Sequence, residues 1–280
     1  MPLVTTAELV GVAHEHGSGL AAFNVITLEH AEAIATAAER VGQPVILQVS
    51  ENAVRFHHGQ VKPILAAAHA VAALAAVPVA VHLDHVEQSD LLHAAADAGA
   101  SSVMFDASKL DYDANVAATR AAADWAHRHG LFLEAELGEV GGKDGAHAPG
   151  VRTDPGEAAA FVAATGVDAL AVAVGSSHAM TTRGARLDFD LIGRLQAAVP
   201  VPLVLHGSSG VPDDDLRHAV RSGITKINVG TILNVAFTDA VRKHLSHNDG
   251  VDPRAYLAPA REATADTVAA IISAITRGDG

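Results

Sequence analysis

The strongest constraint on the fold is a regular alternation between short apolar runs and alanine-rich segments along the 280-residue chain. The apolar runs are continuous, which is typical of strands covered on both faces in a parallel sheet. Parallel strands need right-handed crossovers, and the segments between the runs have helical spacing. Eight runs occur: Ala21–Val25, Val45–Val49, Val79–Leu83, Ser102–Phe105, Leu131–Leu137, Ala169–Val174, Leu203–Leu205 and Thr225–Val229.

Helix-start signals support this pattern. Thr5 with Glu8 forms a capping box, Ser89 is expected to cap the helix after the third strand, and Asp154 followed by Pro155 supplies an N-cap and a proline at N1. The tail from Asp252 onward is expected to form one or two closing helices. The other expected helices include Ala31–Arg40, Ser89–Ala98, Asn115–His129, Pro155–Thr165 and Leu216–Ser222.

Eight strand–helix units in a chain of this length predict a single (β/α)8 TIM barrel over residues 1–280, with an N-terminal capping helix and a C-terminal helical extension. An open doubly wound sheet is the competing architecture. It is disfavoured because no predicted strand is followed by a GxGxxG fingerprint.

The composition narrows the possible partners. The chain has 32 acidic and 19 basic residues, and its net charge of −13 disfavours binding to nucleic acid or to an anionic membrane. A small-molecule partner is therefore expected. The absence of cysteine excludes disulfides and thiolate metal sites, whereas 17 histidines leave nitrogen and oxygen coordination open.

Two segments bear on location. The apolar stretch Ile64–Val81 approaches the length of a membrane span, but it is mostly alanine and is interrupted by His69 and Pro78, so a helix leading into a strand fits better. The first ten residues lack the basic and apolar pattern of a signal peptide. The expected location is the cytoplasm.

Unusual polar residues follow the predicted strands, where barrel enzymes place their active sites. Three histidines, His85, His178 and His206, come from strands 3, 6 and 7, and three imidazoles with an open fourth position are a catalytic zinc arrangement. Adjacent residues of a strand point to opposite faces, so strand 3 must bend if the side chains of Asp84 and His85 are both to face the active site. The other strand-end residues are Asn24, Gln48, Ser50, Asp106, Glu134, Glu136 and Asn228–Thr231.

Two glycine- and serine-containing loops indicate a phosphate site. Gly207–Gly210 follows strand 7, and Asn228–Thr231 lies where strand 8 gives way to a helix. In barrels, these two loops commonly bind phosphate through backbone N–H groups, hydroxyls and a helix N-terminus. The polar loop Gly138–Arg152 after strand 5 is expected to act as a lid.

At these residues the sequence resembles the class II, metal-dependent fructose-bisphosphate/tagatose-bisphosphate aldolases. The resemblance covers nearly the whole chain in family order. The matching blocks are Ala22–Val25, His82–His85, Glu134–Gly138 with Gly141–Gly142, Val174–His178, Leu205–Gly210 and Lys226–Thr231.

The resemblance implies a role for each of these residues. His85, His178 and His206 would hold Zn²⁺, Glu136 would approach it or form a second cation site with Asp106, and Asp84 would be the catalytic acid/base. Asp144 stands where the mobile loop usually carries a glutamate, and Ala179 stands where the family has glycine. A monovalent cation, Na⁺ or K⁺, is also implied near the phosphate. The implied substrate-binding residues are Asn24, Ser50, Ala179, Gly207, Ser208, Ser209, Asn228, Val229, Gly230 and Thr231.

The implied reaction is reversible cleavage of a ketose of the fructose or tagatose 1,6-bisphosphate type to dihydroxyacetone phosphate and an aldehyde, through a zinc-stabilised enediolate. The family further suggests a homodimer or homotetramer. Arg55, Arg152 and Arg183 are candidates for binding a distal phosphate, with surface ion pairing as the alternative for each.

Other functions stay open from the residues alone. One is a class II aldolase acting on another phosphorylated ketose or on a deoxyketo acid. Another is a Schiff-base aldolase using Lys226 on strand 8. A barrel metallohydrolase is less favoured, because strand 1 offers Phe23-Asn24-Val25 in place of a His-x-His pair. A catalytically silent phosphosugar-binding protein is the alternative from another class.

Overall fold

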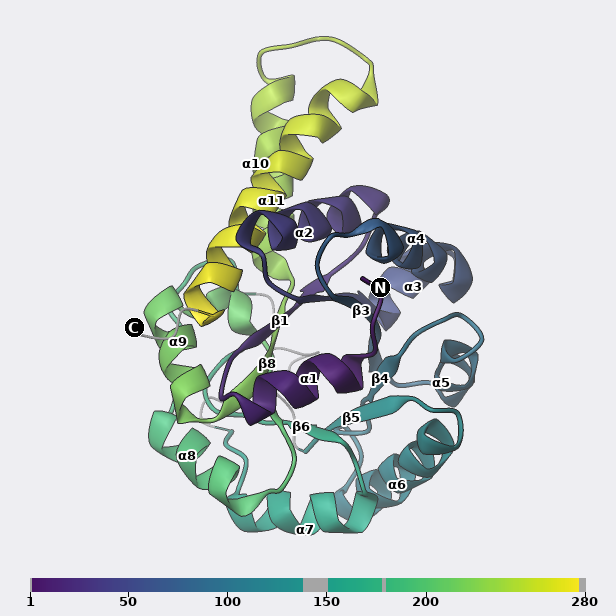
Figure 1. Ribbon diagram of the computed structural model, residues 1–280, viewed down its shortest axis with the longest axis vertical. Coiled ribbons are helices and arrows are strands. Elements are labelled where there is room, and N and C mark those ends of the chain that lie inside the picture. Colours follow the sequence, from purple (N-terminus) through teal and green to yellow (C-terminus); the bar gives the residue numbers. More distant parts are fainter. Residues whose placement is uncertain (1, 138–150, 178–179, 277–280) are drawn as a thin grey trace.

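Eight parallel strands close into a barrel in sequence order in the computed structural model, which describes residues 2–137, 151–177 and 180–276 (Figure 1). The first strand pairs with the last, so the predicted (β/α)8 barrel is confirmed and the open sheet is wrong. The strands are β1 Leu20–Asn24, β2 Val45–Ser50, β3 Val79–Val86, β4 Ser102–Phe105, β5 Phe132–Glu136, β6 Ala169–Ala171, β7 Leu203–Leu205 and β8 Ile224–Val229.

Helices form a ring outside the barrel, and the helix Thr6–Glu15 lies across the end at which the strands begin, which is called here the lower end (Figure 1). They are α1 Thr6–Glu15, α2 Leu28–Val41, α3 Glu51–Phe56, α4 Val61–Leu74, α5 Ser89–Ala95, α6 Tyr112–Arg128, α7 Pro155–Thr165, α8 Phe189–Ala198, α9 Asp213–Ser222, α10 Thr231–Leu245 and α11 Pro253–Thr276, with a short 3₁₀ helix at Ser208–Gly210. The predicted N-terminal capping helix is α1.

Strand residues alternate between two environments. Outward-facing residues such as Phe23 and Leu47 are fully buried against the helices in the main core. Inward-facing residues at the lower end of the barrel, such as Leu20 and Ile46, pack with α1 in a separate apolar cluster. Farther along the same inward-facing rows, the residues become polar. The interior of the barrel is therefore filled by apolar side chains at its lower end, whereas its upper end, at which the strands finish, is lined by the polar candidate site residues.

Two of the three predicted helix starts are confirmed. Thr5 and Glu8 form a complete capping box, and Asp154 accepts hydrogen bonds from two backbone amides at the start of α7. The prediction for Ser89 is wrong. The N-cap of α5 is Gln88, because its backbone is extended and its carbonyl accepts the first intrahelical hydrogen bonds.

The sixth strand is shorter than the sequence predicts. Val172–Val174 is buried, and Val172 still donates to the Val204 carbonyl of β7 at 3.2 Å. The chain then leaves the barrel ladder, because Ala173 exchanges hydrogen bonds with Thr153, whose hydroxyl accepts from the Ala173 amide at 2.8 Å. The apolar run continues past the strand because these residues remain inside the core, so apolar character alone overestimates the length of β6.

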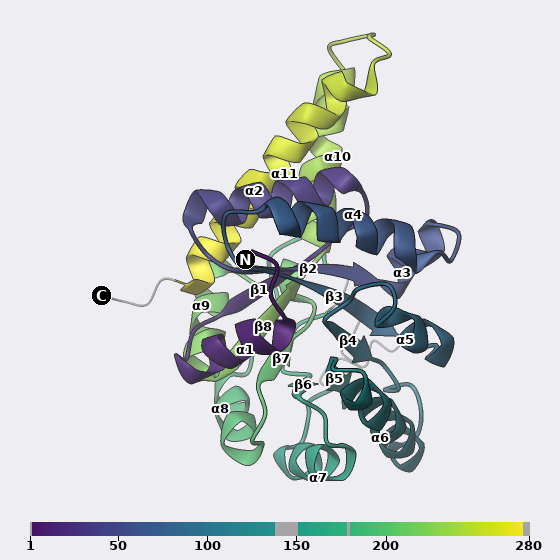
Figure 2. The same cartoon turned by 45° about the vertical axis from the view of Figure 1, so that its right-hand side comes forward.

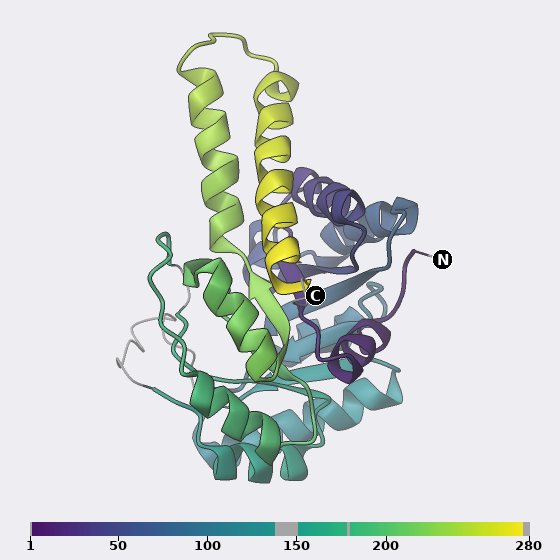
Figure 3. The same ribbon diagram turned by 60° about the vertical axis from the view of Figure 1, so that its left-hand side comes forward.

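The last two helices form an extension beside the barrel. Helices α10 and α11 pack against each other as a long antiparallel pair that projects from the barrel (Figures 2 and 3). Pro259 lies inside α11, which is one continuous helix. The predicted C-terminal helical extension is thus present. Across the described ranges, no helix is both long enough and apolar enough to span a membrane.

Candidate functional site

A bulge at the upper end of β3 places two consecutive side chains on the same side of the strand. The pairing of β3 with β4 shifts register between Leu83 and Val86, and His85 has a left-handed backbone with φ of 51°. The bend that strand parity demanded is confirmed. Left-handed backbone is uncommon for residues other than glycine, and such outliers are often found at functional sites.

The bulge brings His85 into a cluster of metal-binding side chains. Its ring centroid lies 4.8 Å from that of His206, which follows β7, and its Nδ1 lies 3.1 Å from an oxygen of Asp106 after β4. Nδ1 of His206 lies 3.5 Å from Oε2 of Glu136. Ligand atoms lie within 4.8 Å of one another in two overlapping groups, Asp84 with both histidines, and His85 with Asp106 and Glu136.

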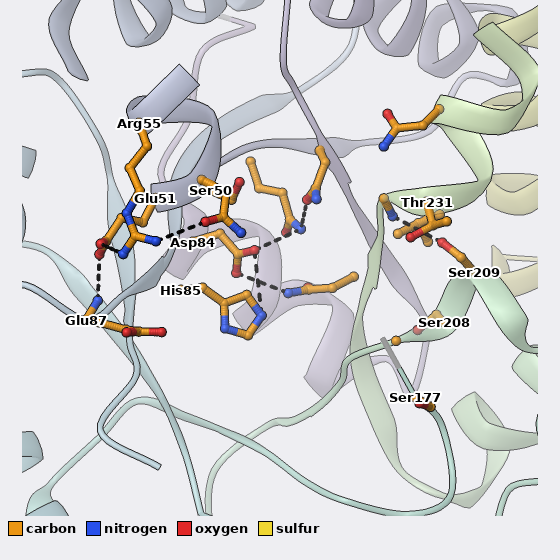
Figure 4. Close-up of a pocket in the computed structure, with 18 of the residues that line it drawn as sticks. Ser50, Glu51, Arg55, Asp84, His85, Glu87, Ser177, Ser208, Ser209 and Thr231 are labelled. Carbon is orange, nitrogen blue, oxygen red and sulfur yellow. Dashed lines mark hydrogen bonds and ion pairs between the residues drawn. The ribbon is translucent and has the colours of Figure 1, made fainter. Parts of the chain in front are cut away.

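Asp84 lies at the centre of a polar network (Figure 4). Its carboxylate oxygens lie 3.4 Å from the side-chain nitrogens of Gln48 and Asn228, which donate to it, and 3.8 Å from Nε2 of His82. Burial alone would raise the pKa of Asp84, but the neighbouring His85 and His82 hold it well below its usual range. Asp84 therefore remains an ionised hydrogen-bond acceptor at neutral pH.

Below this network is a buried ion pair. Nζ of Lys226 on β8 donates to Oε2 of Glu134 at 2.6 Å, and neither side chain is exposed. The other oxygen of Glu134 lies 2.8 Å from Nε2 of His206. Burial raises the pKa of Glu134, but Lys226 and His206 together lower it to about 2. Burial likewise lowers the pKa of His206, and the carboxylates of Glu134 and Glu136 raise it to about 9.

The ion pair predicts an acid-sensitive stability in the metal-free protein. The pKa of Glu134 is lower in the folded state than the ordinary 4.5, so its contribution is present above about pH 4.5 and is lost as pH falls toward about 2. We expect the stability advantage of the wild type over Glu134→Gln to shrink between about pH 6 and about pH 3.5. Urea unfolding of both proteins in EDTA measures this difference, and a constant gap would contradict the prediction.

A cavity of about 490 Å³ opens at the upper end of the barrel above Asp84 and His85. One end of it is formed by the loops after β7 and β8. Gly207 has φ of 67°, and a Cβ there would lie 2.6 Å from the Ser177 backbone, so only glycine fits. Ser209 Oγ accepts from the amides of Gly230 and Ile232 at 3.3 and 3.2 Å, tying one loop to the other.

The predicted substrate-binding residues that the structure describes all line this cavity. The N-terminus of α10 begins at Thr231 and lies beside the Gly207–Ser209 loop (Figure 4). A helix N-terminus carries a partial positive charge that favours an anion. The lining residues from the prediction are Asn24, Ser50, Gly207, Ser208, Ser209, Asn228, Val229, Gly230 and Thr231.

The other end of the cavity contains charged residues that the sequence reasoning missed. Glu51 follows Ser50 at the end of β2, Glu87 follows β3, and Lys109 lies after β4; all three line the cavity with Arg55. Their positions in the segments that follow strands were the available signal. Of the arginines considered for a distal phosphate, Arg55 lies here, whereas Arg183 forms an ion pair with Asp213 at 2.5 Å, outside the cavity. The cavity lining also omits Arg152, whose guanidinium donates to the Val151 carbonyl.

Three predicted site residues lie outside the described residues: His178, Ala179 and Asp144. The same is true of most of the predicted lid, since residues 138–150 are not described. The remaining predicted metal ligands, His85, His206, Glu136 and Asp106, are all in the cluster at the barrel mouth.

Comparison with known proteins identifies one family for this chain. A family model described as "Fructose-bisphosphate aldolase class-II" matches residues 4–279. The chain is 41% identical over 274 residues to a protein of Staphylococcus aureus (strain Mu50 / ATCC 700699) named fructose-bisphosphate aldolase, covering 96% of this chain and 95% of that protein.

Solved structures agree on the fold. The chain resembles the YdjI aldolase from Escherichia coli K12 with a TM-score of 0.84 and 32% identity, covering 98% of this chain and 97% of that one. It also has the fold of the fructose-bisphosphate aldolase from Campylobacter jejuni, with a TM-score of 0.83, 24% identity, and coverage of 98% and 95% of the two chains.

Proposed function

Because the chain belongs to the class-II fructose-bisphosphate aldolase family, and is therefore a carbon–carbon lyase, we propose that it cleaves a phosphorylated ketose of the fructose or tagatose type. The products are dihydroxyacetone phosphate and an aldehyde. The observation that carries this proposal is an ionised Asp84 beside two imidazoles, in the same cavity as a loop pair suited to phosphate.

The donor set fits a zinc ion. Two imidazoles with carboxylates close by are ligands that zinc prefers, and His178 is the proposed third imidazole. In this assignment His85, His178 and His206 hold the ion, and Glu136 with Asp106 offers an adjacent cation site. A zinc ion bound there supplies Lewis-acid stabilisation of the negative charge that develops on the ketose oxygen atoms during cleavage.

Asp84 is the proposed acid/base. Its carboxylate is ionised and is held in place by the amide groups of Gln48 and Asn228, so it is positioned to accept the proton of the C4 hydroxyl in cleavage and to return it in condensation. Asp144 is proposed to move the proton at C3, in place of the glutamate that the family usually carries.

The two loops after β7 and β8 are the proposed phosphate site of the dihydroxyacetone phosphate half. Gly207–Ser209 and Asn228–Thr231 present backbone amides and hydroxyls to the cavity, and the N-terminus of α10 adds its partial charge. Ser50 and Asn24 line the middle of the cavity near Asp84, and Ala179 is proposed to add a backbone amide. A monovalent cation, Na⁺ or K⁺, near the phosphate belongs to the same proposal.

The Schiff-base route is disfavoured by the position of Lys226. Its ammonium group is fully buried and donates to Glu134, and Lys226 does not line the cavity. A nucleophilic lysine must be deprotonated and must reach the substrate carbonyl. The geometry therefore gives Lys226 a structural role.

A metal-dependence assay tests the function. We expect the zinc-loaded protein to cleave phosphorylated ketoses of the fructose or tagatose series, to lose turnover in EDTA and to regain it when zinc is restored. Turnover that persists in EDTA together with a borohydride-trapped adduct would favour lysine instead. Stabilisation by a ketose phosphate without turnover in the zinc-loaded protein would indicate a binding protein.

Three broader expectations stay predictions. They are the organisation of residues 1–280 as one catalytic domain, a cytoplasmic location, and assembly into a homodimer or homotetramer. Sedimentation analysis of the purified protein measures the last of these.

A further inference from the structure

The two ends of the cavity differ in charge. The end formed by the loops after β7 and β8 presents hydroxyls, backbone amides and a helix N-terminus. The other end holds two carboxylates and two cations, on the far side of Asp84 and His85 (Figure 4). These four residues, called here the charged end, are Glu51, Arg55, Glu87 and Lys109.

Glu51 and Arg55 form the inner half of the charged end. Glu51 is only 5% exposed; its Oε2 accepts from the Glu87 amide at 2.8 Å, and its Oε1 accepts from Nη2 of Arg55. The other terminal nitrogen of Arg55 lies 3.3 Å from Oδ1 of Asn52. Both terminal nitrogens of Arg55 therefore already donate to oxygen atoms of the protein, and the carboxylate of Glu51 neutralises the positive charge that faces the cavity.

Glu87 and Lys109 form the outer half. Their charged atoms lie 3.2 Å apart, and their side chains are 35% and 39% exposed. The two carboxylates of the charged end balance its two cations. A second phosphate placed there would carry close to two negative charges at neutral pH and would meet both carboxylates. Repulsion between that phosphate and the two carboxylates disfavours a ligand with a second phosphate. A hydroxyl group at the same position can donate a hydrogen bond to a carboxylate and accept one from a cation.

We propose that the substrate of this aldolase is a ketose 1-phosphate whose distal end carries a hydroxyl group, and that Glu87 excludes a second phosphate. The inference rests on the proposed function and replaces the 1,6-bisphosphate that the resemblance implies with a substrate that carries one phosphate. In cleavage, the C4 hydroxyl loses its proton, the C3–C4 bond breaks, and its electron pair stays on C3, which then takes up a proton. The C4 half leaves as an aldehyde without phosphate, glyceraldehyde in the case of a hexulose.

The test compares fructose 1-phosphate with fructose 1,6-bisphosphate on the zinc-loaded protein. We expect kcat/KM to favour the monophosphate by about ten-fold. Glu87→Gln keeps the size of the side chain and removes its charge, so it is expected to shift the ratio of the two kcat/KM values toward the bisphosphate by about ten-fold. Glu262→Gln is the matched control, because it neutralises a carboxylate that pairs with Arg40 away from the cavity, and it is expected to leave the ratio unchanged.

The outcomes separate this inference from the proposed function. A wild-type preference for the bisphosphate, or a Glu87→Gln variant with an unshifted ratio, overturns the inference while aldolase activity persists. If neither ketose is cleaved, the proposed function fails. The exclusion of a second phosphate is then tested by thermal shift with two ligands that cannot be cleaved, hexitol 1-phosphate and hexitol 1,6-bisphosphate. Larger stabilisation by the monophosphate supports it, and larger stabilisation by the bisphosphate overturns it.

Discussion

Replacing Asp84 with asparagine is expected to lower kcat by about 10² to 10⁴-fold while the protein retains its zinc. Asparagine has nearly the same shape, so it preserves the packing around a residue that is only 2% exposed. It cannot accept the C4 hydroxyl proton, because the amide is not a base at neutral pH. The measurements are steady-state cleavage of a phosphorylated ketose and metal analysis of the same sample.

The metal content makes this result interpretable. Asp84 also belongs to one of the groups whose ligand atoms lie within 4.8 Å of one another, so loss of zinc in the variant would assign it to the metal site instead. Asp190→Asn is a suitable control, since it neutralises an exposed carboxylate in the first turn of α8, outside the cavity lining. An Asp84→Asn protein that retains its metal and has an unchanged kcat would contradict the proposed role of Asp84 as the acid/base.

Lys226→Met is expected to destabilise the fold by about 3–5 kcal/mol, because it leaves the fully buried carboxylate of Glu134 without its ammonium partner. The effect should appear in urea unfolding of the metal-free protein. The exposed ion pair between Lys109 and Glu87 gives a matched comparison: Lys109→Met should cost no more than about 1 kcal/mol.

A second substitution tests the physical cause. If the loss comes from an uncompensated charge, combining Lys226→Met with Glu134→Gln should recover a large part of the stability, because the remaining amide is neutral and still able to bond to His206. A double variant as unstable as the single one would point to lost packing around the lysine chain. Wild-type stability in the single variant would show that the ion pair contributes little.

The resemblance and the strand-end rule predicted most of the candidate site, because a barrel brings the carboxyl ends of all its strands to one face. They could not predict the charged end of the cavity. Glu87 and Lys109 are 22 positions apart, and either could have faced solvent. Nor could they predict the ion pair between Lys226 and Glu134. The two residues are 92 positions apart in the sequence, on β8 and β5, and only closure of the barrel brings their side chains together in its interior.

By itself the sequence determined the eight strands, their order and the end of the barrel that carries the chemistry, because apolar runs, helix caps and turn residues are local signals. Only the tertiary structure decided that Asp84 and His85 face the same cavity. Two neighbours on a regular strand point to opposite sides, and the left-handed backbone of His85 that overrides this rule is fixed by the register shift against β4. Barrel closure then places His85 beside His206, 121 positions later in the chain, and gives the cavity one end suited to phosphate and one end whose charges cancel.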